Sequence, residues 1–334
     1  MTSLPKLCLV ICGGTITMTR DPKSGTLIPA YILSDLLKRV PELETIAEYD
    51  TVFVSDIDST NMTPEIWVRA ARVIAEKAND YDGFIVTHGT DSMAYSASAL
   101  SFLLQGLGKP VIFTGSQTSI SEITGSDARN NLIFAAKFAK EDIGEVAIYF
   151  GNELLRGNRA RKFSQFDFDA FKSFNMPPIG KAGIRPKLAE HRIKRSCQNL
   201  KPVPDLKKGV FLLKYFPGLQ PNIIGNILKL GYHAMVIEGL GAGNLPTHID
   251  FASEIKRATA AGIPIVVTTQ CIVGAAEMHI YEVGKNAEIN GAISGLDMTP
   301  EAAVTKLHWI LSQTTDFAEI TKLVQTNLVG ELSS

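Results

Sequence analysis

Two short segments place a threonine hydroxyl directly after a strand-like apolar run. Residues 6–12 lead into a Gly-Gly-Thr turn that ends at Thr15, and residues 83–87 lead into a His-Gly-Thr-Asp segment that contains Thr90 and Asp91. Glycines let the backbone turn sharply and approach a ligand closely. A threonine hydroxyl at such a position can attack an electrophilic carbonyl once it is activated. The structural alternatives are an ordinary turn for the first segment and a helix cap for Asp91.

A third polar segment, residues 56–63, contains Ser59 and Thr60 before a helical pattern. Short polar side chains are common in loops, but each can also hydrogen-bond a carboxylate or an amine, which suits a small zwitterion. In open α/β sheets, ligands bind beyond the carboxyl ends of the strands. We therefore expect the three segments to lie at one edge of a sheet and to form one site.

The elements that must position these residues form an alternating pattern of strands and helices. Strands are expected at residues 6–12, 51–54, 83–87, 111–114, 146–150, 210–213, 234–237 and 263–267. Helices are expected from the 3.6-residue apolar period at residues 63–74, 93–104, 128–138, 223–228, 299–311 and 320–324. Thr63 and Thr299 each precede a proline and a glutamate, which is typical of a capped helix start.

Two domains of the α/β class are predicted. The strands are rich in Val and Ile without polar alternation, which indicates a mostly parallel sheet covered by helices on both faces. Residues 187–208 interrupt the pattern with basic residues and prolines, so they are interpreted as a solvated linker. The expected limits are a larger N-terminal catalytic domain at 1–186 and a smaller C-terminal α/β domain at 209–334.

Composition excludes several classes of protein. The chain has 334 residues, 45% hydrophobic and 20% charged, with a formal net charge of -1, which fits a globular enzyme rather than a nucleic-acid binder. No apolar run approaches the ~20 residues that span a bilayer, and the N-terminal apolar run is too short for a secretory signal, so a cytoplasmic location is expected. The four cysteines have no CxxC spacing and the six histidines are scattered, so neither a metal nor another cofactor is expected.

Together these segments resemble the bacterial-type L-asparaginase family over essentially the whole chain. The resemblance rests on the Gly-Gly-Thr and His-Gly-Thr-Asp motifs and on further matches at residues 109–117, 126–127, 131–132, 157–162, 168–171 and 239–245. The segment 269–271 is similar to the cytoplasmic type I branch. The resemblance implies a two-domain asparaginase-like fold, hydrolysis of L-asparagine to L-aspartate and ammonia, and weaker use of L-glutamine.

The resemblance also implies roles for individual residues. Thr15 matches the threonine assigned as nucleophile, and Thr90 and Lys162 match a second catalytic group in which the ammonium lowers the effective pKa of the hydroxyl or orients it. Asp91 matches part of that group and the residue that holds the α-ammonium of the substrate. The substrate-binding positions are matched by Ser59, Thr60, Asp91, Ser116 and Asn244. The position of Asn244 reaches a neighbouring subunit's site in the family, which implies a homo-oligomer, either a dimer or a dimer of dimers.

One departure keeps alternatives open. The family carries a tyrosine in the loop after the Gly-Gly-Thr turn, whereas this chain has Thr26 after Gly25, with Tyr31 further on. A binding protein that senses asparagine or aspartate without turnover is therefore one alternative. An amidotransferase-type subunit is another, although its extra N-terminal domain is not expected where the motif begins at residue 13. Which threonine attacks, and whether a regulatory asparagine site lies near Cys271, also stay open.

Overall fold

The structure is a computed structural model that describes residues 3–14, 16, 18–20, 27–29, 33–120, 125–197 and 199–333. The chain divides into two compact units. Unit 1 comprises Met1–Ser173 and Pro177–Val203, and unit 2 comprises Phe174–Met176 and Pro204–Ser334. The chain therefore passes between the units three times.

Unit 1 is built on an eight-stranded sheet. In spatial order its strands are β12 (Lys187–Leu188), β11 (Gly180–Lys181), β8 (Glu153–Arg156), β7 (Val146–Phe150), β6 (Val111–Thr114), β5 (Gly83–Thr87), β1 (Lys6–Ile11) and β4 (Glu48–Phe53). The five strands from β7 to β4 are parallel, whereas β8, β11 and β12 are antiparallel to their neighbours. The predicted mostly parallel sheet is confirmed.

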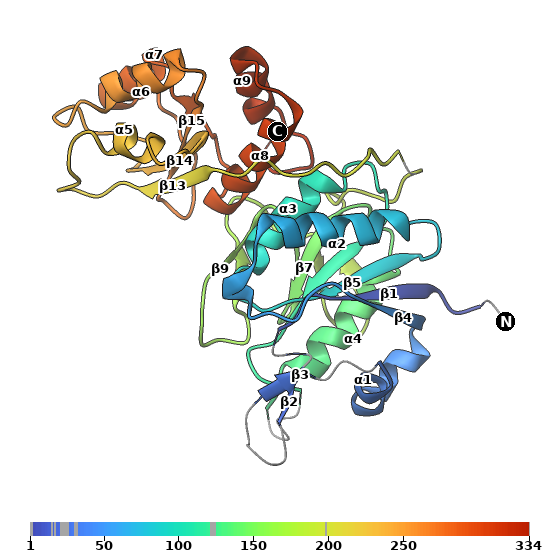
Figure 1. The fold of residues 1–334 in the computed structure, drawn as a ribbon. Coiled ribbons are helices and arrows are strands. Elements are labelled where there is room, and N and C mark those ends of the chain that lie inside the picture. The colour runs from blue at the N-terminus through green and yellow to red at the C-terminus, as the bar shows by residue number, and fades with distance from the viewer. Residues whose placement is uncertain are drawn as a thin grey trace. The chain divides into compact units, whose positions relative to one another are not determined.

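Helices cover both faces of this sheet (Figure 1). α2 (Pro64–Glu76) and α3 (Met93–Leu103) lie on one face, and α4 (Ala128–Ala139) lies on the other with α1 (Leu33–Arg39) and the 3-10 helix η2 (Pro41–Thr45). Leu7 and Leu9 of β1 belong to the same buried cluster as Leu132 of α4. Because successive strand residues point to opposite faces, the buried Cys8 and Val10 face the other layer. This two-sided burial explains the unbroken apolar run.

The two predicted helix starts differ in how they are capped. The Thr299 hydroxyl accepts a hydrogen bond from the backbone N–H of Ala302 at 3.1 Å, as a capping threonine does. The Thr63 hydroxyl makes no such bond. The start of α2 therefore depends on Pro64 in its first turn, whose ring fixes a helical φ angle.

Several short elements were not predicted, because two to four residues are too few to show a period. β9 (Ala160–Lys162) pairs with β10 (Phe171–Ser173), and β2 (Met18–Arg20) pairs with β3 (Leu27–Pro29), both antiparallel. The 3-10 helix η3 spans Ser59–Asn61.

Residues 187–203 differ from the predicted linker because they belong to unit 1. Their basic side chains are engaged near the C-terminal end of α4. Arg192 pairs with Asp142 at 2.8 Å, and Arg195 donates to the backbone carbonyls of Glu141 at 2.7 Å and Ala139 at 3.3 Å. Cationic side chains stabilise the unpaired carbonyls at this end of a helix. The predicted domain limits at residues 186 and 209 stay predictions.

Unit 2 contains a second, smaller parallel sheet. Its strands in spatial order are β13 (Val210–Lys214), β14 (Ala234–Gly239), β15 (Ile265–Thr269) and β16 (Ile293–Ser294). Its helices are α5 (Ile223–Leu228), α6 (Phe251–Ala260), α7 (Glu282–Ile289), α8 (Pro300–Gln313) and α9 (Phe317–Gln325). Buried residues of α5, α6 and α7 form one core with the sheet, and α8 packs on the opposite side of it (Figure 1). No helix among the described residues has the length and apolar character needed to cross a membrane.

Asn175 ties the short segment Phe174–Met176 into unit 2. Its side-chain amide donates to the carbonyls of Gly274 at 2.9 Å and Asp297 at 3.2 Å, and its carbonyl accepts from the Gly274 N–H at 2.9 Å. A residue that precedes β11 of unit 1 in the sequence therefore completes a loop of unit 2.

A buried ion pair anchors the last described residues of unit 2. The Lys306 ammonium of α8 lies 2.6 Å from the Glu331 carboxylate, and the two side chains are 1% and 0% exposed. Lys306 also donates to the carbonyls of Val324 and Thr326. The Glu331 carboxylate accepts the backbone N–H groups of residues 328 and 329. Both charges are thus paired and hydrogen-bonded, which is the condition for burying them.

Breaking this pair is expected to destabilise unit 2. Lys306→Met leaves the Glu331 carboxylate buried without its counter-charge, so the free energy of unfolding should fall by about 3–5 kcal/mol. Urea unfolding measures the change. Lys322→Met is the matched control, since Lys322 is 74% exposed and its ion pair with Glu319 is long, so it should change stability by less than about 1 kcal/mol. Equal effects of the two substitutions would contradict this prediction.

Candidate active site

The ends of the parallel strands of unit 1 lie level with one another. In the sheet register Ile11 is opposite both Phe53 and Thr87, and Thr87 is opposite Thr114. The segments that follow β1, β4, β5 and β6 therefore start at the same edge. The order β4-β1-β5-β6-β7 changes direction between β1 and β5. Such a switch point is where open α/β sheets bind ligands.

Close backbone contacts bring the three predicted motifs together. Gly14 has a φ of +97°, and a Cβ atom placed on it would lie 2.5 Å from the carbonyl carbon of His88. A Cβ atom on Gly89 would lie 2.6 Å from the Ser59 hydroxyl oxygen. Only glycine allows this approach at both positions. The segments that contain the first, second and third motifs are thus in contact, as their positions after the strands predicted.

Lys162 connects two of the predicted side chains at this edge. Its ammonium donates to the Thr90 hydroxyl oxygen at 2.8 Å and to the Asp91 carboxylate at 2.6 Å. The Lys162 side chain is 19% exposed and that of Asp91 is 55% exposed. Asp91 is therefore not a cap of α3, whose N-terminus begins after Ser92 without a side-chain cap. The functional interpretation of Asp91 fits this geometry better than the structural one.

Lys162 is delivered to the site by the β9–β10 hairpin rather than by the parallel strands. It is the last residue of β9 and is paired with Phe171 of β10. The next N–H, that of Phe163, donates to the Ala170 carbonyl at 2.7 Å, which closes the intervening loop. The ammonium therefore approaches from a rigid strand, which is a precise way to place a functional group.

Ser59 and Thr60 lie in η3, directly after β4. Ser59 is 4% exposed, and its carbonyl accepts the Ser92 hydroxyl at 2.5 Å. Thr60 is exposed, and both its N–H and its hydroxyl donate to Asp58 at 2.8 and 2.7 Å. The Thr60 hydroxyl thus serves the local turn, while Ser59 lies against the His-Gly-Thr-Asp segment. Of the two, Ser59 is placed with the Thr90 group.

The turn after β6 contributes Ser116 and Gln117. Ser116 is 4% exposed, and its hydroxyl has no hydrogen-bond partner among the described residues. The Gln117 side-chain oxygen lies 3.5 Å from the Thr90 hydroxyl, which makes it a further neighbour of that group. The sequence had pointed to this turn as part of a family motif but gave Gln117 no role.

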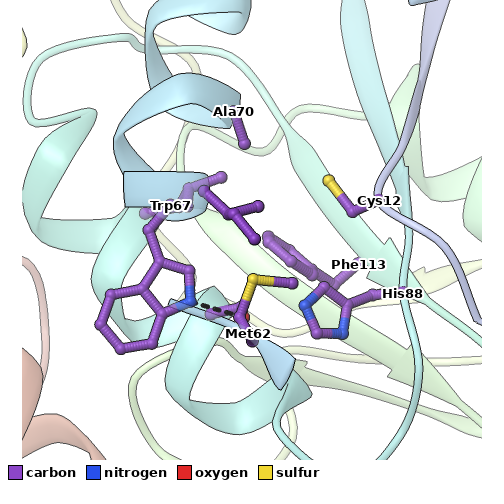
Figure 2. Close-up of a pocket in the computed structure, with 9 residues that line it drawn as sticks. Cys12, Met62, Trp67, Ala70, His88 and Phe113 are labelled. Carbon is purple, nitrogen blue, oxygen red and sulfur yellow. Dashed lines mark hydrogen bonds between the residues drawn. The ribbon is translucent and has the colours of Figure 1, made fainter. Parts of the chain in front are cut away.

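His88 lies beneath the site with its ring in the core. The imidazole is 1% exposed, and its Nδ1 lies 2.7 Å from the Gly89 carbonyl. Because a carbonyl only accepts, the neutral ring must carry its proton on Nδ1. Figure 2 shows the ring at a cavity of about 10 Å³ that is also lined by Cys12, Met62, Trp67 and Phe113. Nε2 has no partner among the described residues. Burial lowers the pKa of His88 to about 4, although the bond to Gly89 opposes the shift.

Two predicted site residues stand apart from this cluster. Thr15, with Thr26 and Tyr31 of the following loop, lies outside the described residues. Asn244 belongs to unit 2, where it forms a two-way backbone bridge with Leu240 and where its side-chain oxygen is buried without a partner among the described residues. Within unit 1 the structure therefore brings together Ser59, Thr90, Asp91, Ser116 and Lys162.

The arrangement offers three kinds of group to a small polar ligand. A carboxylate that is half exposed can bind an amine, hydroxyls and backbone N–H groups can bind a carboxylate, and a threonine hydroxyl contacts an ammonium that can polarise it. The described residues contain no group of three or more His, Cys, Asp and Glu side chains that could hold a metal ion.

His88 is expected to make unit 1 sensitive to acid. Its pKa in the fold is about 4 against an ordinary 6.5, so the unfolded chain binds its proton first as the pH falls. The free energy of unfolding should therefore decrease between about pH 6.5 and pH 4, by up to about 3 kcal/mol. Urea unfolding at stepped pH measures this loss. His88→Gln should reduce the pH slope and the exposed-site control His233→Gln should not; an unchanged slope in His88→Gln would contradict the prediction.

Comparison with known proteins gives consistent matches over both units. The family model "Asparaginase, N-terminal" matches residues 6–194, and "Glutaminase/Asparaginase C-terminal domain" matches residues 209–324. L-asparaginase 1 of Escherichia coli is 40% identical over 96% of each chain. The D-type subunit of glutamyl-tRNA(Gln) amidotransferase from Pyrococcus horikoshii is 37% identical over 99% of this chain and 77% of its own length.

Solved structures agree with these matches. L-asparaginase I from Vibrio cholerae has a TM-score of 0.89 at 35% identity, covering 99% of this chain and 100% of that one. The thermostable L-asparaginase from Thermococcus kodakarensis has a TM-score of 0.90 at 33% identity, covering 98% and 99%. The sequence motifs, the strand order and the cluster around Lys162 thus have a common explanation: the chain belongs to the asparaginase family.

Proposed function

We propose that this protein is an L-asparaginase that hydrolyses the side-chain amide of L-asparagine to L-aspartate and ammonia. The observation that carries the proposal is the position of the Lys162 ammonium, which contacts both the Thr90 hydroxyl and the Asp91 carboxylate at the switch point of the sheet. One cation at this place can polarise a reacting hydroxyl and also orient the carboxylate that binds the substrate.

Recognition of the substrate rests on its two charges. Asp91 has an exposed carboxylate and is assigned to the α-ammonium group of asparagine. Ser59, which lies against Gly89, is assigned to the α-carboxylate. Opposite charges at fixed distance from the side-chain amide select an α-amino acid over a simple amide, because each unmatched charge in the site would lose a charge-assisted hydrogen bond.

The reaction proceeds through an acyl-enzyme. A threonine oxygen adds to the amide carbonyl as its proton is removed, and the tetrahedral oxyanion collapses with loss of the amine, which leaves as ammonia after it is protonated. Water then adds to the ester, and aspartate is released with the threonine restored. Thr15 is assigned as this nucleophile from the family resemblance, and Thr90 with Lys162 forms the second catalytic group.

Features beyond the active site of unit 1 belong to the same proposal. Asn244 is assigned to the site of a neighbouring subunit, so the active form is a homodimer or a dimer of dimers. The location is cytoplasmic, as the N-terminal sequence predicts. A sigmoidal dependence of rate on asparagine concentration would reveal a regulatory site near Cys271.

A second candidate function is that of an ammonia-supplying subunit in a tRNA-linked amidation. It is favoured by the 36–37% identity to D-type amidotransferase subunits from Pyrococcus species, which is close to the 40% found with an asparaginase. Such a role uses the same amide hydrolysis but adds recognition of tRNA. The net charge of -1 gives no basic excess for that purpose.

Ammonia release from purified protein tests the proposed activity. We expect release from L-asparagine, weaker release from L-glutamine, and a loss of about 10²-fold or more in kcat for Thr15→Ala, Thr90→Ala and Lys162→Met. Thr63→Val is the control, because the Thr63 hydroxyl caps no helix and its removal should leave kcat within about twofold.

Two results would contradict the assignment. Near-normal activity of one threonine variant would remove that residue from the reaction. Binding of asparagine in calorimetry without any ammonia release from the folded wild-type chain would favour the sensor alternative, in which the absent loop tyrosine matters.

The amidotransferase alternative predicts binding of tRNA. For the proposed asparaginase we expect no retardation of tRNA in a gel-shift experiment at low salt, because sequence-independent binding depends on phosphate neutralisation by Lys and Arg. Retardation at micromolar protein that weakens steeply with added salt would favour the alternative.

A further inference from the structure

The Gln117 side chain contacts two separate parts of the proposed catalytic group. Its amide oxygen Oε1 lies 3.5 Å from the Thr90 hydroxyl, and its amide nitrogen Nε2 donates to the Asp167 carbonyl at 3.2 Å. Asp167 lies in the loop that follows Lys162. We propose that Gln117 is a positioning residue that sets the orientation of the Thr90 hydroxyl, an inference that rests on the proposed asparaginase function.

The Asp167 carbonyl determines which end of the Gln117 amide faces Thr90. A backbone carbonyl can only accept a hydrogen bond, so the NH₂ group must point to Asp167. The Oε1 atom is then left facing Thr90, and Oε1 can only accept. The hydrogen of the Thr90 hydroxyl is therefore directed to Gln117.

This direction settles how Thr90 presents its lone pairs. A hydroxyl has one hydrogen and two acceptor lone pairs. The Lys162 ammonium occupies one lone pair at 2.8 Å, and the hydrogen points to Gln117. The second lone pair remains for the ligand. Without Gln117 the hydroxyl can rotate, and the populations of its orientations are then divided among competing acceptors, such as the nearby Asp91 carboxylate.

The long distance between Oε1 and Thr90 is compatible with this role. At 3.5 Å the contact is weaker than an ordinary O–H···O hydrogen bond. Hydrogen bonds of catalytic groups are often long until the substrate is bound, when they shorten. Gln117 therefore acts on the orientation of Thr90 during turnover and contributes little to the stability of the fold.

The backbone of Gln117 is fixed independently of its side chain. Its N–H donates to both oxygens of Asp127, at 3.1 and 3.0 Å, and the same carboxylate accepts the N–H and the hydroxyl of Thr118. The buried Asn131 amide holds Asp127 at 3.1 Å and the Gly115 carbonyl at 2.9 Å. Substitution of the Gln117 side chain therefore leaves the turn in place.

The test compares two variants that divide the functions of the Gln117 amide. Gln117→Met removes both the acceptor and the donor at similar length, whereas Gln117→Glu keeps an acceptor for Thr90 and loses the donor to Asp167. For Gln117→Met we expect kcat for asparagine to fall by about tenfold or more, with KM and the urea midpoint nearly unchanged. Gln117→Glu should recover most of the loss. Thr118→Val, which alters the same turn without a contact to Thr90, should retain wild-type kcat.

The possible outcomes separate this inference from the proposed function. An active wild-type enzyme with an unimpaired Gln117→Met variant overturns the positioning role alone. A loss in Gln117→Met that is matched by Gln117→Glu, or that appears only as a lower urea midpoint, overturns it as well, because the acceptor would then not be the relevant feature. A wild-type chain that releases no ammonia from asparagine or glutamine overturns both proposals.

Discussion

The ion pair between Lys162 and Asp91 is the interaction on which the proposed site depends. A mostly buried ammonium must be paired and hydrogen-bonded to be tolerated, and here the two partners come from segments 71 residues apart. Asp91 is placed by the end of a central parallel strand, whereas Lys162 is placed by an antiparallel hairpin. The pair therefore brings the parallel sheet and the hairpin into one catalytic arrangement, and Thr90 is polarised only where they meet.

The order of the strands explains why such an arrangement arises at this edge. The reversal between β1 and β5 separates the segments that follow them, and the glycines at 14 and 89 let these segments approach again through their backbones. Gln117 and Ser116 are added by the next strand along. Each of these side chains thus starts from the end of a buried strand, whose position is fixed by two-sided packing. Rigid supports of this kind keep functional groups within the small tolerances that catalysis requires.

Much of this could be predicted from the sequence, because long apolar strands and their polar ends have clear patterns. The runs at 83–87, 111–114 and 146–150 have the predicted limits, and the three polar motifs meet as expected. The strands β8 to β12 are too short to have a period, so they were missed. The basic residues 192 and 195 suggested a solvated segment, but they bind carbonyls near the end of α4, which only the three-dimensional structure reveals. The contact of Gln117 with Thr90 was hidden for the same reason, since it joins residues 27 positions apart.

The path of the chain between the units has a consequence for modularity. Because Phe174–Met176 belongs to unit 2 while Pro177–Val203 returns to unit 1, no single cut in the chain separates the two. A fragment that starts at Pro204 would lack Asn175, and the loop carbonyls of Gly274 and Asp297 would lose a partner. Unit 2 is thus not an exchangeable cassette, and recombination that shuffles whole domains would have to carry the three-residue excursion with it. The sequence of each unit is accordingly constrained by the other, even at positions far from the reaction.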